Sequence, residues 1–179
     1  MSTPVDAALD RLVRDVEDFP SPGVVFKDIT PLLADPEGFA TMVAALADLA
    51  RRMAPDGVDA VIGVEARGFI LAAPVALALG SGFVPVRKVG KLPGQTYDVS
   101  YSLEYGEETL QIHQDALRAG QRVLIVDDVF ATGGTVEATA ELVRQCGAHI
   151  CGAAVLLELA FLNGRGRLGG LELGAIRVV

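Results

Sequence analysis

The order of hydrophobic and polar positions predicts helices and strands that alternate along the chain. Apolar residues recur at helical spacing in several segments, and short β-branched or aliphatic runs lie between them. The predicted helices cover residues 5–16, 36–53, 69–79, 115–119 and 136–145, and the predicted strands cover residues 58–64, 83–86, 123–126, 152–158 and 175–179. This alternation indicates an α/β fold, a twisted and mainly parallel sheet flanked by helices and joined by right-handed crossovers.

Two segments depart from that alternation. Residues 19–31 hold three prolines and a glycine, which exclude a regular helix and predict a rigid, irregular loop. The loop also carries Val24, Val25 and Phe26, so it either caps the core or forms one wall of an apolar pocket, where Phe26 could stack on a planar ligand. Residues 96–104 and 108–114 have strand composition on either side of a short turn, which predicts a hairpin or flexible flap.

The strongest chemical signal follows the apolar run at 123–126. Asp127 and Asp128 come directly after it, and a small-residue loop then precedes the helix at 136–145. The loop consists of Ala131, Thr132, Gly133, Gly134 and Thr135. Amides at a helix N-terminus and threonine hydroxyls bind phosphate, whereas carboxylates accept hydrogen bonds from ribose hydroxyls or hold hydrated Mg²⁺. We therefore predict a sugar-phosphate site; the alternative is an ordinary strand, turn and helix cap.

Cations gather near the same predicted edge of the sheet. Arg67 lies in the turn after the strand at 58–64, where a guanidinium can bind a phosphate in bidentate fashion. Arg87, Lys88 and Lys91 follow the strand at 83–86 in a glycine-containing loop. Surface solubility is the alternative explanation for the lysines, but their grouping after a buried strand favours anion binding.

Length and charge narrow the class of protein. A chain of 179 residues with 51% hydrophobic and 21% charged residues predicts one globular domain over 1–179. The net charge of −8 argues against a nucleic-acid or membrane-surface partner. The uncharged segment 68–86 is interrupted by Pro74 and by glycines, so a buried helix and strand are expected there rather than a membrane span.

The N-terminus and the cysteines bear on the compartment. No basic region followed by an apolar run opens the chain, so we expect no signal peptide and a cytoplasmic protein. Cys146 and Cys151 have no further cysteine or ligand set nearby, and we expect both to be buried free thiols.

Five motifs resemble those of the type I phosphoribosyltransferases, and in particular of the adenine phosphoribosyltransferases. They are residues 19–31, 65–69, 86–94, 102–106 and 126–135, in that family's order and spacing, and they extend over nearly the whole chain. The resemblance implies the type I phosphoribosyltransferase fold with a small base-binding hood, at 1–35, and a flexible catalytic flap, at 93–113. It implies transfer of the phosphoribosyl group of phosphoribosyl diphosphate (PRPP) to adenine, which forms AMP and pyrophosphate in purine salvage.

The resemblance also implies residue roles for the sugar and pyrophosphate. Asp127 and Asp128 would hold the ribose hydroxyls, and the loop at 131–135 would hold the 5′-phosphate. Pyrophosphate would contact Arg67, Lys88 and Lys91, together with Arg87 from the neighbouring subunit of a homodimer.

For the base, the resemblance implies that Val25, Phe26 and Lys27 bind adenine, with the backbone of Val25 contacting the edge of the ring. Glu104 would be the acid/base residue on the flap. Mg²⁺ would be the cofactor, held mainly through PRPP and water with no direct protein ligand.

Two other functions stay open at this point. The chain could be a phosphoribosyltransferase for hypoxanthine, guanine or xanthine, although Lys27 is the one lysine in the N-terminal loop that could contact a C6 carbonyl. It could also be a PRPP-sensing regulator that has lost catalysis. Such a regulator needs a DNA-binding segment, which this acidic chain is not expected to contain.

Overall fold

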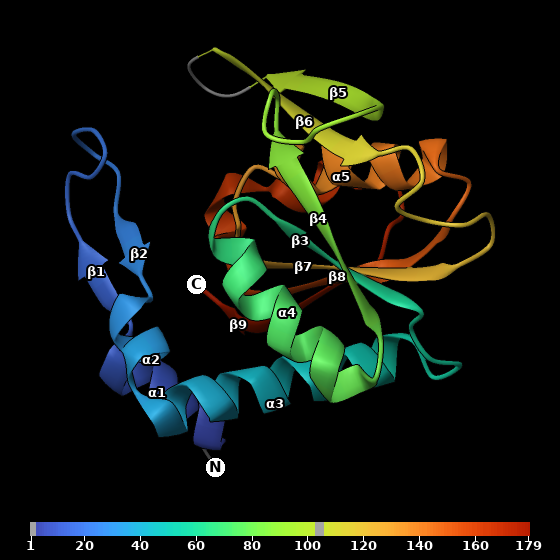
Figure 1. Cartoon of the computed structure of the whole chain (residues 1–179). Coiled ribbons are helices and arrows are strands. Elements are labelled where there is room, and N and C mark those ends of the chain that lie inside the picture. The colour runs from blue at the N-terminus through green and yellow to red at the C-terminus, as the bar shows by residue number, and fades with distance from the viewer. Residues whose placement is uncertain (1–2, 103–105) are drawn as a thin grey trace. The chain divides into compact units, whose positions relative to one another are not determined.

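The first 45 residues form a compact unit in which short helices accompany a two-stranded sheet. The structure, a computed structural model, describes residues 3–102 and 106–179 (Figure 1). The chain divides into two units, Met1–Ala45 and Leu46–Val179. The elements that lie in the first unit or begin there are α1 (Pro4–Leu12), β1 (Arg14–Val16), β2 (Phe26–Asp28), α2 (Thr30–Ala34) and α3 (Pro36–Met53).

Helix α1 is shorter than its apolar pattern predicts. It begins with a capping box, in which the Thr3 hydroxyl accepts from the Asp6 amide at 3.2 Å and the Asp6 carboxylate accepts from the Thr3 amide at 3.1 Å. The predicted helix up to Val16 is wrong beyond Leu12, because Arg14–Val16 pairs antiparallel with Phe26–Asp28 instead. Strand pairing satisfies the same backbone groups that a longer helix would have used.

The proline-rich segment is also more regular than predicted. Residues 26–28 form β2, and Thr30 begins α2 with Pro31 in its first turn, where a missing amide proton costs nothing. Helix α3 has the predicted bounds, Pro36–Met53. The carboxylate of Asp35 accepts from the Gly38 amide at 2.7 Å, which satisfies one of the free donors at the start of α3.

The second unit is built on a seven-stranded sheet with the order β5-β6-β4-β3-β7-β8-β9. Its strands are β3 (Ala60–Val64), β4 (Gly82–Lys88), β5 (Thr96–Ser102), β6 (Glu107–His113), β7 (Arg122–Phe130), β8 (His149–Glu158) and β9 (Leu173–Val178). Strands β4, β3, β7, β8 and β9 are parallel to their neighbours in that order, while β6 pairs antiparallel with both β4 and β5. The mainly parallel sheet and the hairpin are therefore as predicted.

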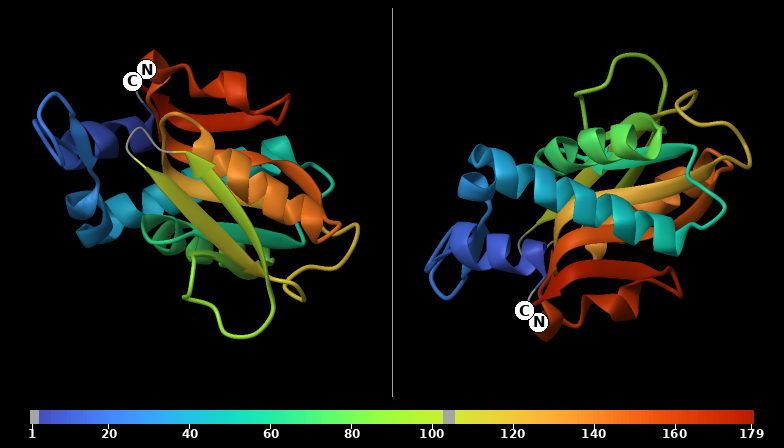
Figure 2. Two further views of the ribbon diagram at one scale, coloured as in Figure 1. Left: turned by 90° about the horizontal axis from the view of Figure 1, so that it is seen from above. Right: turned by 90° about the horizontal axis from the view of Figure 1, so that it is seen from below.

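Two helices of this unit cover opposite faces of the sheet. Helix α4 (Arg67–Leu79) lies on the face that carries Gly63, and α5 (Gly134–Gln145) packs on the face that carries Ile62 and Val64 (Figures 1 and 2). Every residue of β3 is buried, as expected for a strand with a helix on each side. The C-terminal residue of α3, Met53, contacts the strands at Gly152 and Gly174.

Three other features differ from the prediction. Strand β7 continues through both aspartates to Phe130, because β8 is long enough to pair with it up to Phe130↔Glu158. Residues 115–119 form turns and bends instead of a helix, and the Arg118 amide donates to the side chain of Gln121 rather than within a helical turn. The polar segment after β8 contains two short 3-10 helices, η1 (Ala160–Leu162) and η2 (Gly164–Arg167).

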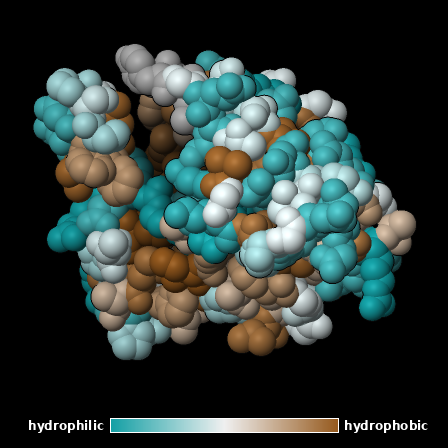
Figure 3. All heavy atoms as spheres, turned by 45° about the horizontal axis from the view of Figure 1, so that its top comes forward, coloured by the Kyte–Doolittle hydropathy of each residue, from teal (hydrophilic) through white to brown (hydrophobic). Residues whose placement is uncertain are grey.

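The surface carries both hydrophilic and hydrophobic side chains. Hydrophilic side chains predominate on the face drawn in Figure 3, and hydrophobic side chains form smaller patches among them. Within the described part of the chain, none of the helices combines the length and the apolar character needed to cross a bilayer. Cys146 and Cys151 are free thiols as predicted, but both are half-buried rather than buried.

The contact between β3 and α4 leaves no room for a side chain at Gly63. A methyl group there would lie 2.8 Å from Cβ of Ala72 and 2.9 Å from the ring of Phe83. We expect Gly63→Ala to lower the free energy of unfolding by about 1–3 kcal/mol through overpacking. Urea denaturation measures this change.

The matched control is Gly82→Ala in the adjacent strand β4. A methyl group at Gly82 has its nearest neighbour, the Asp59 carbonyl oxygen, at 3.7 Å. That variant should stay within about 0.5 kcal/mol of the wild type. Equal losses in the two variants would contradict the packing argument.

Candidate active site

The acidic pair and Arg67 come together because β3 and β7 are parallel neighbours. Asp127 and Asp128 lie near the carboxyl end of β7, and Arg67 begins α4 directly after β3. Nε of Arg67 lies 2.7 Å from Oδ2 of Asp128, whose side chain is 6% exposed. The start of α4 can lie this close to Asp127 because residue 68 is glycine: a methyl group there would be only 2.8 Å from Oδ1 of Asp127. The structure thus unites two of the predicted site elements.

Burial controls the protonation of this pair. Desolvation raises the pKa of Asp127 well above its ordinary value, and the charge of the Asp128 carboxylate raises it further. Desolvation also raises the pKa of Asp128, although the Arg67 guanidinium opposes that rise. The two carboxyls are therefore held in a site that disfavours two full negative charges until a ligand supplies hydrogen-bond donors or a cation.

The small-residue loop after β7 presents backbone amides at a helix start. Gly133 takes a left-handed conformation, with φ of 88°, and α5 begins at Gly134 without a side-chain cap. This leaves the first amides of α5 without the side-chain acceptor that usually satisfies them, as at anion-binding helix starts. Residues 131–135, called the phosphate loop below after the ligand predicted for them, therefore combine a left-handed glycine with an uncapped helix start, and phosphate binding there stays a prediction.

The hairpin of β5 and β6 contacts the phosphate loop through Tyr101. The Tyr101 hydroxyl lies 3.1 Å from Oγ1 of Thr135 and donates to Oε2 of Glu108 at 3.2 Å. Oε1 of Glu108 in turn lies 2.5 Å from Nζ of Lys88. Burial is the main cause that raises the pKa of Tyr101, so the phenol stays protonated and able to donate. A polar chain through Glu108 and Tyr101 therefore links Lys88 to Thr135 near the turn end of the hairpin.

Tyr101 and Glu108 were not among the site residues predicted from the sequence. The two are directly opposite in the antiparallel register of β5 and β6. Every second residue of a strand lies on the same face, so Tyr101 shares a face with Val99, and both pack against the core. The apolar character of this face was the available sign that it packs inward.

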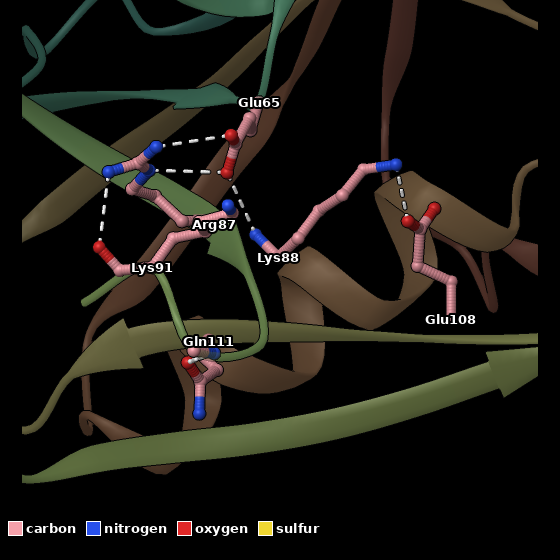
Figure 4. Close-up of polar contacts among 7 residues, drawn as sticks. Glu65, Arg87, Lys88, Lys91, Glu108 and Gln111 are labelled. Carbon is pink, nitrogen blue, oxygen red and sulfur yellow. Dashed lines mark hydrogen bonds and ion pairs between the residues drawn. The ribbon is translucent and has the colours of Figure 1, made fainter.

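The remaining cations form a second cluster around Glu65 (Figure 4). Nη2 and Nε of Arg87 donate to the two carboxylate oxygens of Glu65, each at 3.1 Å, and the Lys88 amide donates to Oε2 at 3.1 Å. Nη1 of Arg87 also donates to the carbonyl oxygen of Lys91 at 3.1 Å. The hydrogen bonds from Arg87 lower the pKa of Glu65. Glu65, which the sequence analysis did not single out, orients this loop.

Gln111 holds the other end of the same loop. Its Oε1 accepts from the Gly90 amide at 2.9 Å (Figure 4). Its Nε2 donates to Oδ1 of Asp98 at 3.0 Å. Strand β4 extends beyond the predicted end at Val86 to include Arg87 and Lys88, and of the three cations only Lys91 lies in the loop. The end of β4 and this loop are tied both to the turn after β3 and to the hairpin strands.

The residues predicted to bind the base lie in the first unit. The Phe26 ring makes an edge contact with Phe19, with centroids 5.2 Å apart, and Val25 is 45% exposed. Nζ of Lys27 donates to both carboxylate oxygens of Asp15, at 2.7 and 2.8 Å. The predicted catalytic residue, Glu104, lies outside the described residues.

The chemistry of the acidic pair fits Mg²⁺ only in part. Two neighbouring carboxylates supply oxygen ligands of the kind that Mg²⁺ prefers, but Asp128 is already paired with Arg67. Across residues 3–102 and 106–179, no three His, Cys, Asp or Glu side chains gather closely enough to hold a metal ion. Binding of Mg²⁺ at Asp128 would therefore compete with the Arg67 guanidinium.

Comparison with known proteins agrees with this geometry. The phosphoribosyl transferase domain matches residues 30–167. An adenine phosphoribosyltransferase from Parafrankia sp. is 58% identical over 96% of this chain and 91% of its own length. The crystal structure of adenine phosphoribosyltransferase from Rhodothermus marinus is 46% identical and superposes with a TM-score of 0.89, covering 97% of both chains.

A yeast structure adds ligands to the comparison. Adenine phosphoribosyltransferase from Saccharomyces cerevisiae, complexed with an imino-altritol bisphosphate and adenine, is 38% identical with a TM-score of 0.89 over 96% of this chain and 97% of that one. Family match, sequence identity and fold all lead to the same conclusion: the chain belongs to the phosphoribosyltransferase family, among the adenine phosphoribosyltransferases.

Proposed function

We infer that this chain transfers the 5-phosphoribosyl group of PRPP to adenine, forming AMP and pyrophosphate. One observation carries this assignment: the phosphate loop, the acidic pair and Arg67 occupy the same edge of the sheet. Such a site matches a ligand that carries a phosphate, vicinal hydroxyls and a further anionic group. The yeast relative bound to adenine and a bisphosphate analogue supports the same pair of substrates.

The proposed binding of PRPP divides the ligand among three groups of residues. The amides and hydroxyls of residues 131–135 hold the 5′-phosphate, and Asp127 and Asp128 accept hydrogen bonds from the ribose hydroxyls. Arg67, Lys88 and Lys91 contact the pyrophosphate. To do so, Arg67 and Lys88 exchange their present carboxylate partners, Asp128 and Glu108, for phosphate oxygens.

Departure of pyrophosphate develops positive charge on the ribose and negative charge on the leaving group. The cations stabilise the leaving group, and Mg²⁺, bound through PRPP and water, would add further positive charge there. We propose that Glu104 accepts the ring proton of adenine as the new bond to the anomeric carbon forms. The flap at 93–113 would exclude water that could otherwise hydrolyse the activated sugar.

Residues 1–35 are proposed as the base-binding hood of a single domain, with Val25, Phe26 and Lys27 at adenine. Two contacts of the Lys27 ammonium group go to the carboxylate oxygens of Asp15, which leaves one of its three protons for a further acceptor. A C6 carbonyl could therefore accept only this remaining proton, whereas adenine has no carbonyl that needs it.

A homodimer is the proposed assembly, with Arg87 directed to the neighbouring subunit's site. Helix α4 supports this assembly, because Ile70 and Leu77 on it are 44% and 83% exposed and Phe83 of β4 is 38% exposed. In the described structure Arg87 pairs with Glu65 of its own chain, so its guanidinium would have to be shared or released. A cytoplasmic location stays a prediction from the sequence.

Substrate choice tests the assignment directly. Purified protein with PRPP and Mg²⁺ should convert adenine with a kcat/KM at least about tenfold above that for hypoxanthine or guanine, since the latter need a donor to their C6 oxygen. Absorbance change on nucleotide formation gives the rates. Faster turnover of an oxopurine would contradict the adenine assignment, and absence of turnover with PRPP binding intact would favour the regulatory alternative.

The raised pKa of Asp127 makes the stability of the ligand-free protein depend on pH. Its ordinary value is 3.8, so above about pH 4 the folded state binds more protons than the unfolded state, and stability falls as pH rises toward the raised folded pKa. One such proton contributes at most about 1.4 kcal/mol per pH unit. Thermal melts of the wild type should show this decline.

Asp127→Asn should reduce the decline, because the asparagine side chain does not titrate, and the part that remains comes from Asp128. The Oδ1 atom of the asparagine can still accept from the Asp128 backbone amide, as Oδ1 of Asp127 does at 2.9 Å. The same variant should raise the PRPP KM, since it weakens the acceptor for the ribose hydroxyls. Identical pH profiles of melting temperature in wild type and variant would show that Asp127 is not the group responsible.

Glu104→Gln tests the proposed proton transfer. We expect kcat to fall by about 10²- to 10⁴-fold while the adenine KM changes much less, because the amide keeps the shape of the side chain but cannot take a proton. Glu107→Gln, an exposed residue at the start of β6, is the control. A Glu104→Gln enzyme with the rate and pH profile of the wild type would remove this role.

A further inference from the structure

The phosphate loop is supported from behind by the turn that follows β8. The end of β8 lies beside the end of β7, since Phe130 is paired with Glu158 and the Leu159 amide donates to the Phe130 carbonyl at 2.8 Å. After η1, Asn163 takes a left-handed conformation with φ of 53°, and the chain turns back at Gly164. This path brings the turn at 163–165 against the phosphate loop.

The two backbones touch without an intervening side chain. A methyl group on Gly164 would overlap the Ala131 carbonyl oxygen and would lie 2.8 Å from the carbonyl carbon of Thr132. Conversely, a methyl group on Gly133 would lie 2.8 Å from the Gly164 carbonyl oxygen. Contact from both sides leaves the phosphate loop little freedom to move toward the turn.

An ion pair holds the turn in place. Nε and Nη2 of Arg165 bind the two carboxylate oxygens of Glu158, both at 2.6 Å, and Nη1 donates to the Leu173 carbonyl at 3.1 Å. Glu158 is 4% exposed, so little water competes for its charge. On the other side of the turn, Leu168 is buried with Phe130 and Val136. The turn is therefore attached to the last residue of β8 and the first residue of β9, and it packs on the core beneath α5.

We propose that this turn sets the conformation of the phosphate loop, with Gly164 as the contact and Arg165 and Glu158 as positioning residues that never touch substrate. The proposal rests on the proposed function in that the phosphate loop binds the 5′-phosphate. Amides that must converge on one phosphate group lose affinity when they are displaced by a fraction of an ångström. The turn thus contributes to PRPP affinity from outside the binding site.

A pair of glycine variants tests the contact. Gly164→Ala places a methyl group against Ala131 without a backbone penalty, since Gly164 is not in the left-handed region. Gly166→Ala, two residues along the same turn, has no atom within 4 Å of its methyl group. By calorimetry with ribose 5-phosphate, we expect Gly164→Ala to weaken binding at least about tenfold and Gly166→Ala to remain within about twofold of the wild type.

Steady-state kinetics separate positioning from a general loss of structure. Gly164→Ala should raise the KM for PRPP and leave the KM for adenine close to the wild-type value. A merely structural defect would lower the amount of folded protein and leave the affinity of each folded molecule unchanged. Equal affinities of the two glycine variants for ribose 5-phosphate would overturn the proposal.

A second variant keeps the test valid if Gly164→Ala does not fold. Arg165→Lys retains the charge but loses the bidentate geometry, and should weaken ribose 5-phosphate binding about five- to tenfold. Its control is Arg144→Lys, in an exposed pair with Glu141 on α5. Unchanged binding in Arg165→Lys would overturn the positioning role. Wild-type protein that binds ribose 5-phosphate but forms no AMP would contradict the proposed function alone.

Discussion

The parallel pairing of β3 with β4 and β7 is the constraint on which the site depends. Parallel strands deliver their carboxyl ends to one edge of the sheet, so the segments that follow β3, β4 and β7 meet there. Lys88 is the last residue of β4, Asp128 lies near the end of β7, and Arg67 begins the helix that follows β3. The close contact at Gly63 keeps α4 against β3, and this contact determines where the arginine at the start of α4 can lie.

Three cations of the site are each paired with a carboxylate of the same chain. Arg67 pairs with Asp128, Lys88 pairs with Glu108, and Arg87 pairs with Glu65. An acidic protein can in this way keep a cluster of cations for an anionic ligand without leaving them unpaired. If pyrophosphate binds to these cations as proposed, binding exchanges one set of ionic partners for another, and the net gain in free energy is smaller than the direct attraction alone. Lys88, Glu108, Tyr101 and Thr135 form one polar chain. A change of partner at Lys88 therefore alters the hydrogen bonds available to Tyr101 and Thr135.

Much of the fold could be predicted from the sequence, and the failures have identifiable causes. Helix α3 has its predicted bounds because the apolar stripe, the first-turn proline and the Asp35 cap are all local signals. The apolar stripe at 5–16 was misleading beyond Leu12, where pairing with β2 prevails over helical periodicity. Strand β7 extends through Asp128 to Phe130 because β8 provides a partner there, and no local pattern reports the length of a neighbouring strand.

The sequence by itself determined the chemistry of the site: two adjacent acids, a glycine loop before a helix, and cations after buried strands are all legible from residue type and order. Backbone freedom and side-chain charge belong to individual residues, so they need no fold to be recognised. Only the tertiary structure decided the partners, such as Glu108 for Lys88 and the Gly164 turn for the phosphate loop. These contacts join segments separated by tens of residues, and they exist only because sheet order and register bring those segments together.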